Sequence, residues 1–299
     1  MKAYKGFNKD MTCRGFQYEE GKEYETEEAS LCSTGFHACE NPLDCLAYYA
    51  PADSVYHEVE LGEVSGDTDD DSKRCAKKIK IGAKVELLDI IKATFEYVKE
   101  HCTSEKHGDD RTCLTGGDWS ALNGGDWSAL NGGDRSALNG GDCSALKGGY
   151  WSALNGGDWS ALNGGDGSAL NGGDGSALNG GYRSALNGGY RSALNGGYRS
   201  ALNGGDWSAL NGGDRSALNG GYRSALNGGN RSALNGGNRS VVYGGEGAKV
   251  KGGMRSVLAI QHWRDCKFIR IAFAEVDGEK IKADTWYKLD ENGEFVEVE

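Results

Sequence analysis

Apolar and polar residues recur with a strict eight-residue period through the middle of this chain. From residue 116 to residue 259, the pattern Gly-Gly-x-x-Ser-Ala-Leu-Asn occurs eighteen times without an insertion or a deletion. Leu occupies position 7 of sixteen octads, and Val replaces it in the other two. A gapless short period indicates a solenoid, in which each unit packs only on its neighbours. A helix is disfavoured, because two Gly per octad would cost about 2 kcal/mol relative to Ala.

Turn and strand residues are separated within each octad. Asn and Gly adopt positive φ at low cost, so the Asn-Gly-Gly segment predicts the turn. The following x-Ser-Ala-Leu segment predicts a four-residue strand, whose side chains alternate between two faces. Because Leu is the one consistently apolar position, we expect Leu and Ser to face inward, and Ala and position 4 to face outward. A buried row of Ser hydroxyls can then hydrogen bond from coil to coil.

The residue at position 4 indicates how many octads form one coil. When octads are paired from Gly116, position 4 matches in six of the first eight pairs, as in Trp119 with Trp127. The other pairing matches in two of eight. We therefore predict a two-sided β-solenoid with about 16 residues per coil. A triangular coil of three octads is the alternative. Nine coils would span roughly 43 Å at the usual strand spacing.

The segments on either side of the octads predict separate units. Residues 1–105 predict an α+β head domain with strands at 2–7, 55–61 and 77–81. Asn41-Pro42 is a typical helix start, and residues 85–101 have helical spacing. Residues 106–115 are expected to be a linker and first cap.

The end of the chain predicts a short β cap over residues 260–299. Three segments are strand-like, at 267–276, 285–289 and 295–298. Asp277-Gly278 and Asn292-Gly293 are typical of hairpin turns. The whole chain is therefore expected to be mainly β.

Composition indicates the cellular compartment in which we expect the protein. The 299 residues carry a net charge of −11 and nine Cys, and no apolar run reaches membrane length. The first ten residues lack a signal-peptide core, so we expect reduced thiols and a cytoplasmic location. Cys32, His37, Cys39 and Cys45 form a cluster with ligand chemistry, but their spacing fits no compact zinc pattern. The sequence nominates no catalytic residue, no metal site and no cofactor.

Charge is distributed unevenly along the octads. Residues 116–179 carry seven Asp against one Arg and one Lys, whereas residues 180–259 carry eight Arg and two Lys against three acids. One interpretation is that these charges only keep a Gly-rich rod soluble. The other is that the outward rows bind a partner, with Trp as an anchor. The candidate binding residues are Trp119, Trp127, Trp151, Trp159, Arg183, Arg191, Arg199, Trp207, Arg215, Arg223, Arg231 and Arg239.

Several partners fit such rows. Ordered Arg could contact phosphates, an acidic protein surface, or the acidic half of a second copy laid antiparallel. We favour the antiparallel homodimer, because one chain already contains both halves. Nucleic-acid binding is less favoured, and no membrane contact is expected.

The octads resemble the Gly-x-x-Ser-x-Leu repeat of bacterial ice-nucleation proteins, which implies a β-solenoid over residues 116–259. Ice binding itself would need outward rows of Thr, which are absent here. The chain also carries Gly35-Phe36-His37-Ala38-Cys39-Glu40-Asn41-Pro42-Leu43, with Ala3-Tyr4-Lys5-Gly6-Phe7 and Cys13-Arg14-Gly15-Phe16 before it. These segments resemble the head domain of phage- and prophage-encoded proteins of Gram-positive bacteria, which also carry Gly-rich octads.

That resemblance implies a phage context and hence a host-cell cytoplasm. We expect a non-enzymatic protein that inhibits or sequesters a host defence factor through head and solenoid surfaces. A structural or adhesive phage protein is the first alternative. The second is an ADP-ribosyltransferase-like enzyme, since Tyr4-Lys5-Gly6 and Gly35-Phe36-His37-Ala38 resemble segments of that fold. Lys5 replaces the Arg or His of that family, and Glu58 and Glu60 have the spacing of its acidic loop but lie in a predicted strand.

Overall fold

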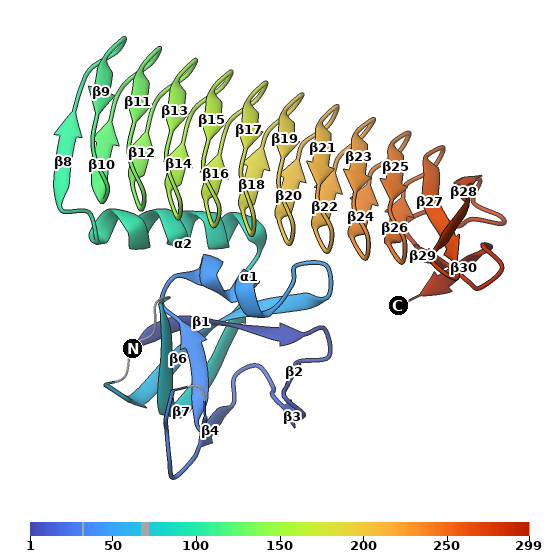
Figure 1. Ribbon diagram of the computed structural model, residues 1–299, viewed down its shortest axis with the longest axis horizontal. Helices are drawn as coiled ribbons and strands as arrows, with labels where there is room; N and C mark the ends of the chain where they lie inside the picture. The colour runs from blue at the N-terminus through green and yellow to red at the C-terminus, as the bar shows by residue number, and fades with distance from the viewer. Residues whose placement is uncertain (32, 67–71, 299) are drawn as a thin grey trace.

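The computed structural model describes residues 1–31, 33–66 and 72–298. The chain is mainly β, with 46% strand and 7% helix, and an N-terminal α+β region precedes a solenoid of about 10 turns (Figure 1). Each turn holds about 16 residues, which confirms the paired-octad coil. The acidic segment at 67–71 and Cys32 of the cysteine cluster lie outside the described residues.

The head is built on a five-stranded sheet in the order β4-β7-β5-β1-β6, in which β6 also pairs with β7. Its strands are β1 (Lys2–Asn8), β4 (Glu23–Glu25), β5 (Phe36–Cys39), β6 (Ser54–Val64) and β7 (Lys73–Lys84). The pairing of β6 with β7 closes the sheet into a small barrel, and β4 and β5 pair with successive parts of β7. The predicted strands at 2–7, 55–61 and 77–81 all fall within observed strands.

Four short elements and a longer helix complete the head. β2 (Thr12–Cys13) and β3 (Phe16–Gln17) form a small hairpin. The predicted helix start is confirmed, since the Asn41 side chain accepts the backbone N–H of Leu43 at the start of η1 (Pro42–Asp44), and α1 (Cys45–Tyr48) follows. The second helix, α2, spans Leu87–Glu100.

The solenoid has two parallel sheets, each containing every second octad. The covered sheet contains β8 (Ser104–His107), β10 (Ser120–Asn123), β12 (Ala137–Asn139), β14 (Ala153–Asn155), β16 (Ala169–Asn171), β18 (Ala185–Gly188), β20 (Ala201–Gly204), β22 (Ala217–Gly220), β24 (Ala233–Gly236) and β26 (Lys249–Gly252). The open sheet contains β9 (Cys113–Thr115), β11 (Ala129–Asn131), β13 (Ala145–Lys147), β15 (Ala161–Asn163), β17 (Ala177–Asn179), β19 (Ala193–Asn195), β21 (Ala209–Gly212), β23 (Ala225–Gly228), β25 (Val241–Gly244) and β27 (Val257–Arg264). Leu side chains from both sheets form one buried core along the rod.

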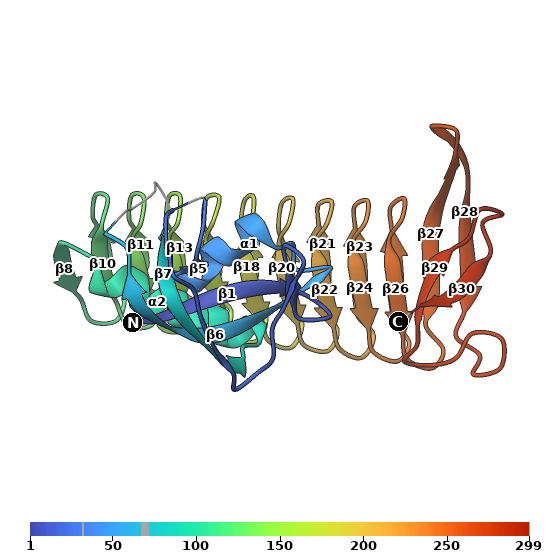
Figure 2. The same ribbon diagram turned by 90° about the horizontal axis from the view of Figure 1, so that it is seen from below.

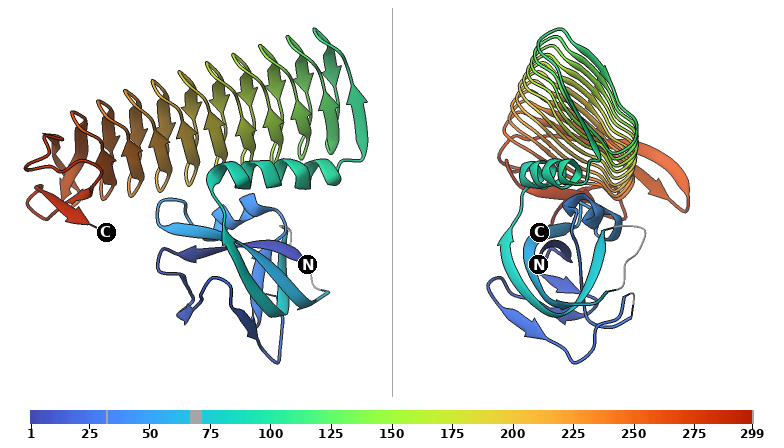
Figure 3. Two further views of the ribbon diagram at one scale, coloured as in Figure 1. Left: turned by 180° about the vertical axis from the view of Figure 1, so that it is seen from behind. Right: turned by 90° about the vertical axis from the view of Figure 1, so that its left-hand side faces the viewer.

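Helix α2 lies along the covered sheet, with the head beneath it (Figures 1 and 3). Ile90 and Ile91 of α2 belong to a buried cluster with Ala169 and Ala185 of the covered sheet. The small Ala side chain lets the helix approach closely. Ala185 is therefore buried, whereas Ala177 on the open sheet is exposed. The part of this face from β12 to β20 is thus covered by α2 and the head.

The first coil begins before the octads do. β8 pairs in parallel with β10, and β9 pairs in parallel with β11. The stretch 106–115, expected to be a linker and cap, therefore contains solenoid strands. Residues 108–115 keep a degenerate form of the octad, Gly-Asp-Asp-Arg-Thr-Cys-Leu-Thr, and satisfy the same backbone hydrogen bonds.

The strand boundaries and the turn conformation within an octad differ from the prediction. Strands consist of Ala-Leu-Asn, so Ala and Asn face outward and position 4 lies in the turn. Position 4 carries the positive φ, as in Trp119 at 57° and Arg183 at 57°, whereas we expected it at Asn-Gly-Gly. This conformation costs roughly 1 kcal/mol or more in a residue with a side chain. Inter-coil hydrogen bonds offset that cost, as when the Trp119 N–H donates to the carbonyl of Asp134 at 2.9 Å.

The Ser row is buried as predicted, but its main partner differs. The Ser136 hydroxyl donates to the carbonyl of Gly133 at 2.9 Å and lies 3.3 Å from that of Gly117. The shortest contact between neighbouring hydroxyls here, Ser120 to Ser136, is longer at 3.4 Å. The hydroxyls therefore bond mainly to Gly carbonyls in the turns, which keeps each buried oxygen satisfied.

The C-terminal cap contains the three predicted strands, but the first of them pairs with the last solenoid strand and not with the next strand of the cap. β28 (Lys267–Glu275) pairs antiparallel with β27 through a turn at Asp265-Cys266, where both residues have positive φ. β29 (Trp286–Leu289) pairs with β26 and with β30 (Phe295–Val298). Asn292-Gly293 lies in the β29–β30 hairpin turn as predicted. Asp277-Gly278 does not join two paired strands, because β28 and β29 belong to different sheets.

Candidate functional site

The position-4 residues are brought together along the two narrow edges of the rod, not on its broad faces. The first edge is formed by turns that lead from the open to the covered sheet, and the second edge by turns that lead back. The first edge carries Trp119, Trp151, Arg183, Arg199, Arg215 and Arg231. The second edge carries Trp127, Trp159, Arg191, Trp207, Arg223 and Arg239. The sequence correctly grouped these residues into two rows but placed the rows on sheet faces.

Several residues of the first edge already make contacts within the molecule. Nη1 of Arg199 donates to the carbonyl of Ala47 in the head at 2.7 Å. The guanidinium of Arg135 lies between two indoles, 4.7 Å from the ring centre of Trp119 and 5.1 Å from that of Trp151. Trp119, Arg183, Arg199 and Arg215 are all half-buried.

The second edge is open to solvent along its length. All six predicted residues on it are exposed, and Trp127 and Trp159 expose 63% and 67% of their surface. Its first half also carries Asp126, Asp142, Asp158 and Asp174, whereas its second half carries the Arg side chains. Charge on this edge therefore changes sign along the rod.

Aromatic rings hold several of these Arg side chains in place. The guanidinium of Arg223 lies 4.6 Å from the ring centre of Trp207 and 5.2 Å from that of Tyr222. The guanidinium of Arg191 lies 4.9 Å from the ring centre of Tyr190. Each contact restricts a long flexible side chain, so the row is ordered before any partner binds.

An apolar surface that the octad pattern did not predict lies on the terminal hairpin β27–β28, which projects past the rod (Figure 2). Phe268, Ile269, Ile271 and Phe273 of β28 are exposed, Phe273 by 76%. β28 is also the last strand of its sheet. A cluster of exposed apolar side chains on an edge strand is typical of a protein-contact surface.

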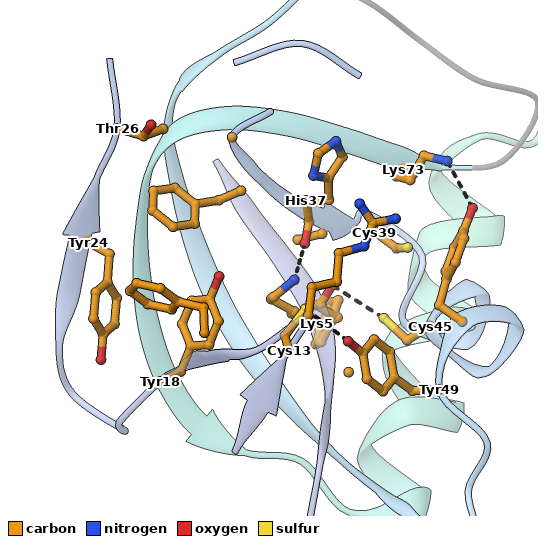
Figure 4. A pocket seen from close by; sticks show the side chains of 18 of the residues that line it. Lys5, Cys13, Tyr18, Tyr24, Thr26, His37, Cys39, Cys45, Tyr49 and Lys73 are labelled. Carbon is orange, nitrogen blue, oxygen red and sulfur yellow. Dashed lines mark hydrogen bonds between the residues drawn. The ribbon is translucent and has the colours of Figure 1, made fainter. Parts of the chain in front are cut away.

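The head contains a cavity of about 720 Å³ between β1, β5, the β2–β3 hairpin and α1 (Figure 4). Its walls carry cations, aromatic rings and three thiols, and a single carboxylate among the described residues. The residues with this chemistry are Tyr4, Lys5, Cys13, Arg14, Phe16, Tyr18, Tyr24, Glu25, Phe36, His37, Cys39, Cys45, Tyr48, Tyr49 and Lys73. A concave site of this size, lined by aromatic rings and by charged and hydrogen-bonding groups, fits a small organic ligand.

Hydrogen bonds order the polar part of the cavity. Nζ of Lys5 donates to the carbonyl of His37 at 2.8 Å, and Nζ of Lys73 donates to the hydroxyl of Tyr48 at 3.1 Å. The Tyr49 hydroxyl donates to Sγ of Cys13 at 2.9 Å. Figure 4 shows these side chains converging from separate strands and from α1.

The surroundings in the cavity shift the pKa values of two residues that line it, His37 and Tyr18. Burial, together with the positive charges of Lys5, Arg14 and Lys73, lowers the pKa of His37 below its ordinary value of 6.5. Burial raises the pKa of Tyr18 to about 12, aided by Cys13 and Tyr24. Burial is the largest cause of both shifts, and the neighbouring positive charges add to it only for His37.

The residues expected for an ADP-ribosyltransferase-like enzyme do not meet in this cavity. Lys5 and His37 line it, but Glu58 and Glu60 lie on β6 and are not among the lining residues. Nζ of Lys2 forms an ion pair with Glu58 at 2.9 Å. Among the described residues, no group of three or more His, Cys, Asp or Glu side chains is arranged to hold a metal ion.

Residues 1–93 match the family model for a domain of unknown function, DUF7666. The match therefore covers the barrel, the cavity and the start of α2, but not the solenoid. No curated protein and no solved structure matches the chain. No described helix is long and apolar enough to cross a membrane.

Proposed function

We propose that this protein is a non-enzymatic binding protein of phage or prophage origin that inhibits or sequesters a bacterial defence factor. The observation that carries the proposal is the second edge, where Trp127, Trp159, Trp207 and the interleaved Arg side chains are all exposed. A soluble rod needs charges on its surface, but it does not need large indoles held in one row. Exposed Trp and ordered Arg are the side chains that contribute most to protein contacts.

The backbone supports that function by keeping the row rigid. Each coil is bonded to the next through parallel strands and through turn hydrogen bonds such as Trp127 N–H to the carbonyl of Asp142 at 2.8 Å. A partner therefore meets a preformed surface, and little conformational entropy is lost on binding. The basic half of the second edge favours an acidic protein patch.

A second copy of the chain meets the same requirements. In an antiparallel homodimer, the acidic half of one second edge, from Asp126 to Asp174, would face Arg191, Arg223 and Arg239 of the other. The contact is self-complementary, as a twofold axis requires. Because it depends on charge, we expect a dimer at low salt and a monomer at high salt. A molecular mass that stays monomeric at both salt concentrations would remove the dimer from the proposal.

Affinity capture from a bacterial lysate tests the wider proposal with the full-length protein. The test variant reverses three charges on the second edge: Arg191→Glu, Arg223→Glu and Arg239→Glu. The control reverses three exposed charges outside the Trp and Arg rows: Lys92→Glu, Lys99→Glu and Lys288→Glu. We expect the wild type and the control to capture the same protein and the test variant to lose it. Equal capture by all three would contradict a role for the second edge.

The structural or adhesive alternative predicts a different location for the protein. A component of the phage particle would be found in purified virions, whereas an inhibitor would remain in the infected cell. Mass spectrometry of purified particles therefore separates the two functions.

A further inference from the structure

Lys5 is a buried cation without an anionic partner among the described residues. Its side chain lies inside the head with 6% of its surface exposed. Nζ donates one hydrogen bond, to the carbonyl of His37 at 2.8 Å, and lies 5.5 Å and 5.8 Å from the ring centres of Phe7 and Tyr18. An ammonium has three N–H donors, and burying its charge is costly unless an anion compensates it. Lys5 therefore has both charge and donors available to a ligand.

Other cations line the same cavity. Arg14 and Lys73 are on its wall, and together with Lys5 they disfavour the charged form of His37. Glu25 is the single carboxylate among the described lining residues, and it forms an ion pair with Nζ of Lys78 at 3.3 Å. Among the described lining residues, the charges of Lys5 and Arg14 are thus left for an anionic ligand.

Aromatic rings form the remaining wall. Tyr18, Tyr24 and Phe16 contact one another edge to face, with ring centres 4.8 to 5.4 Å apart. Phe16 exposes 48% of its surface and is available to a planar group. Base rings stack on aromatic side chains of this kind. The volume of about 720 Å³ lies within the range of small-ligand sites.

We propose that the head cavity binds a nucleoside phosphate, with the phosphate at Lys5 and Arg14 and the base against the aromatic wall. Arg and Lys bind phosphate through charge-assisted hydrogen bonds, and entry of the anion compensates the buried ammonium. The site is separate from the second edge, so it goes beyond the partner binding proposed above and can fail independently of it.

Calorimetry with the full-length protein tests the site. The probes are ADP, GDP, CDP and UDP, with adenosine and inorganic phosphate as the two separated parts. We expect at least one diphosphate to bind, inorganic phosphate to compete with it, and adenosine to bind at least about tenfold more weakly because it lacks the charge. The proposal is overturned if no diphosphate binds at millimolar concentration, or if adenosine binds as tightly as ADP.

Lys5→Met gives the sharper test, because we expect it to weaken nucleotide binding without lowering the stability of the ligand-free protein. Removing an uncompensated buried cation should leave the melting temperature of the ligand-free protein unchanged or raise it. The same change should weaken nucleotide binding by about tenfold or more. Lys2→Met, on the same strand and outside the cavity, should bind nucleotide like the wild type. Unchanged nucleotide affinity in Lys5→Met would overturn the proposal.

Arg14→Asn provides a second variant that does not alter the barrel interior. Arg14 lies in the β2–β3 turn with a φ of 50°, a conformation that Asn tolerates. We expect normal folding and weaker nucleotide binding. If Lys5→Met does not fold, an Arg14→Asn protein with undiminished affinity would itself contradict the proposed phosphate position.

Discussion

Oδ1 of Asp158 accepts the backbone N–H of Asp174, one coil further along the rod, at 2.8 Å. Asp118 makes the same bond to Asp134 at 2.9 Å. The position-3 carboxylates therefore connect successive turns, where the strands themselves do not pair. Asn serves equally well, since Oδ1 of Asn230 accepts the N–H of Glu246 at 2.9 Å.

Replacing Asp158 tests that role. Asp158→Ala leaves the N–H of Asp174 without its side-chain acceptor, so we expect a loss of about 1 kcal/mol in the free energy of unfolding. Asp158→Asn keeps an acceptor oxygen in place and should cost much less. Thermal melts of both variants provide the measurement. Equal losses in the two variants would show that the negative charge, not the hydrogen bond, is what matters.

Gly at position 2 should tolerate substitution only where no turn of the preceding coil lies against it. A Cβ on Gly165 would lie 3.0 Å from the backbone carbon and oxygen of Gly149, so we expect Gly165→Ala to destabilise the rod by about 1 kcal/mol or more. A Cβ on Gly117 has no atom within 4 Å. Gly117→Ala should therefore be neutral or slightly stabilising, because it lowers the entropy of the unfolded chain. Melting temperatures that change equally in both variants would refute the packing argument.

The Trp119–Arg135–Trp151 stack should contribute to stability on the first edge. Arg135→Gln removes the cation from between the two indoles, and we expect a loss of about 1 kcal/mol. Arg215→Gln is the matched control, because Arg215 has no ring partner among the described residues. Urea unfolding followed by circular dichroism compares the two. The stack is energetically unimportant if both variants unfold at the wild-type urea concentration.

His37 should make stability depend on pH below neutrality. Burial and the charges of Lys5, Arg14 and Lys73 lower its folded-state pKa below 6.5, whereas the unfolded chain retains the ordinary value. Between these two values the unfolded state binds more protons, so stability falls as the pH drops below about 6.5 and levels off below the folded pKa. His37→Gln should flatten the melting temperature between neutral and acidic pH. An unchanged slope in that variant would assign the pH dependence to other groups.

The octad period was sufficient to predict the solenoid because each coil contacts only its neighbours. Repetition of Trp119 at Trp127 and of Arg183 at Arg191 identified the two-octad coil, and Leu at position 7 identified the core. The predicted position of the turn was wrong, because the turn lies at positions 3 and 4 of the octad and not at Asn-Gly-Gly. Glycine's conformational freedom suggested positive φ at Asn-Gly-Gly. The first Gly is needed because Ser and Leu of its own octad lie against it, and the second because the neighbouring coil approaches closely. Periodicity cannot distinguish conformational freedom from close packing as the reason for Gly.

The head cavity could not be predicted, because its residues come from segments far apart in the chain. Lys5, Cys13, His37 and Lys73 meet only after β1, β5 and β7 close the barrel. The sequence signal that could have found Lys5 is weak: a Lys in an otherwise apolar strand between Tyr4 and Phe7. The apolar hairpin was missed for a similar reason, since β28 has the composition of a buried strand and only its place at the end of the sheet exposes Phe273.

Local repetition alone thus determined the architecture of the rod, its coil size and the two rows of Trp and Arg, because those properties depend on contacts between neighbouring units. The tertiary structure decided which surfaces remain available. Docking of α2 and the head buries Ala185 and half-buries Arg183, while Ala177 and Arg191, in chemically equivalent octads, stay exposed. Identical repeats acquire different roles when a neighbouring domain packs on one side, and no periodic pattern contains that information.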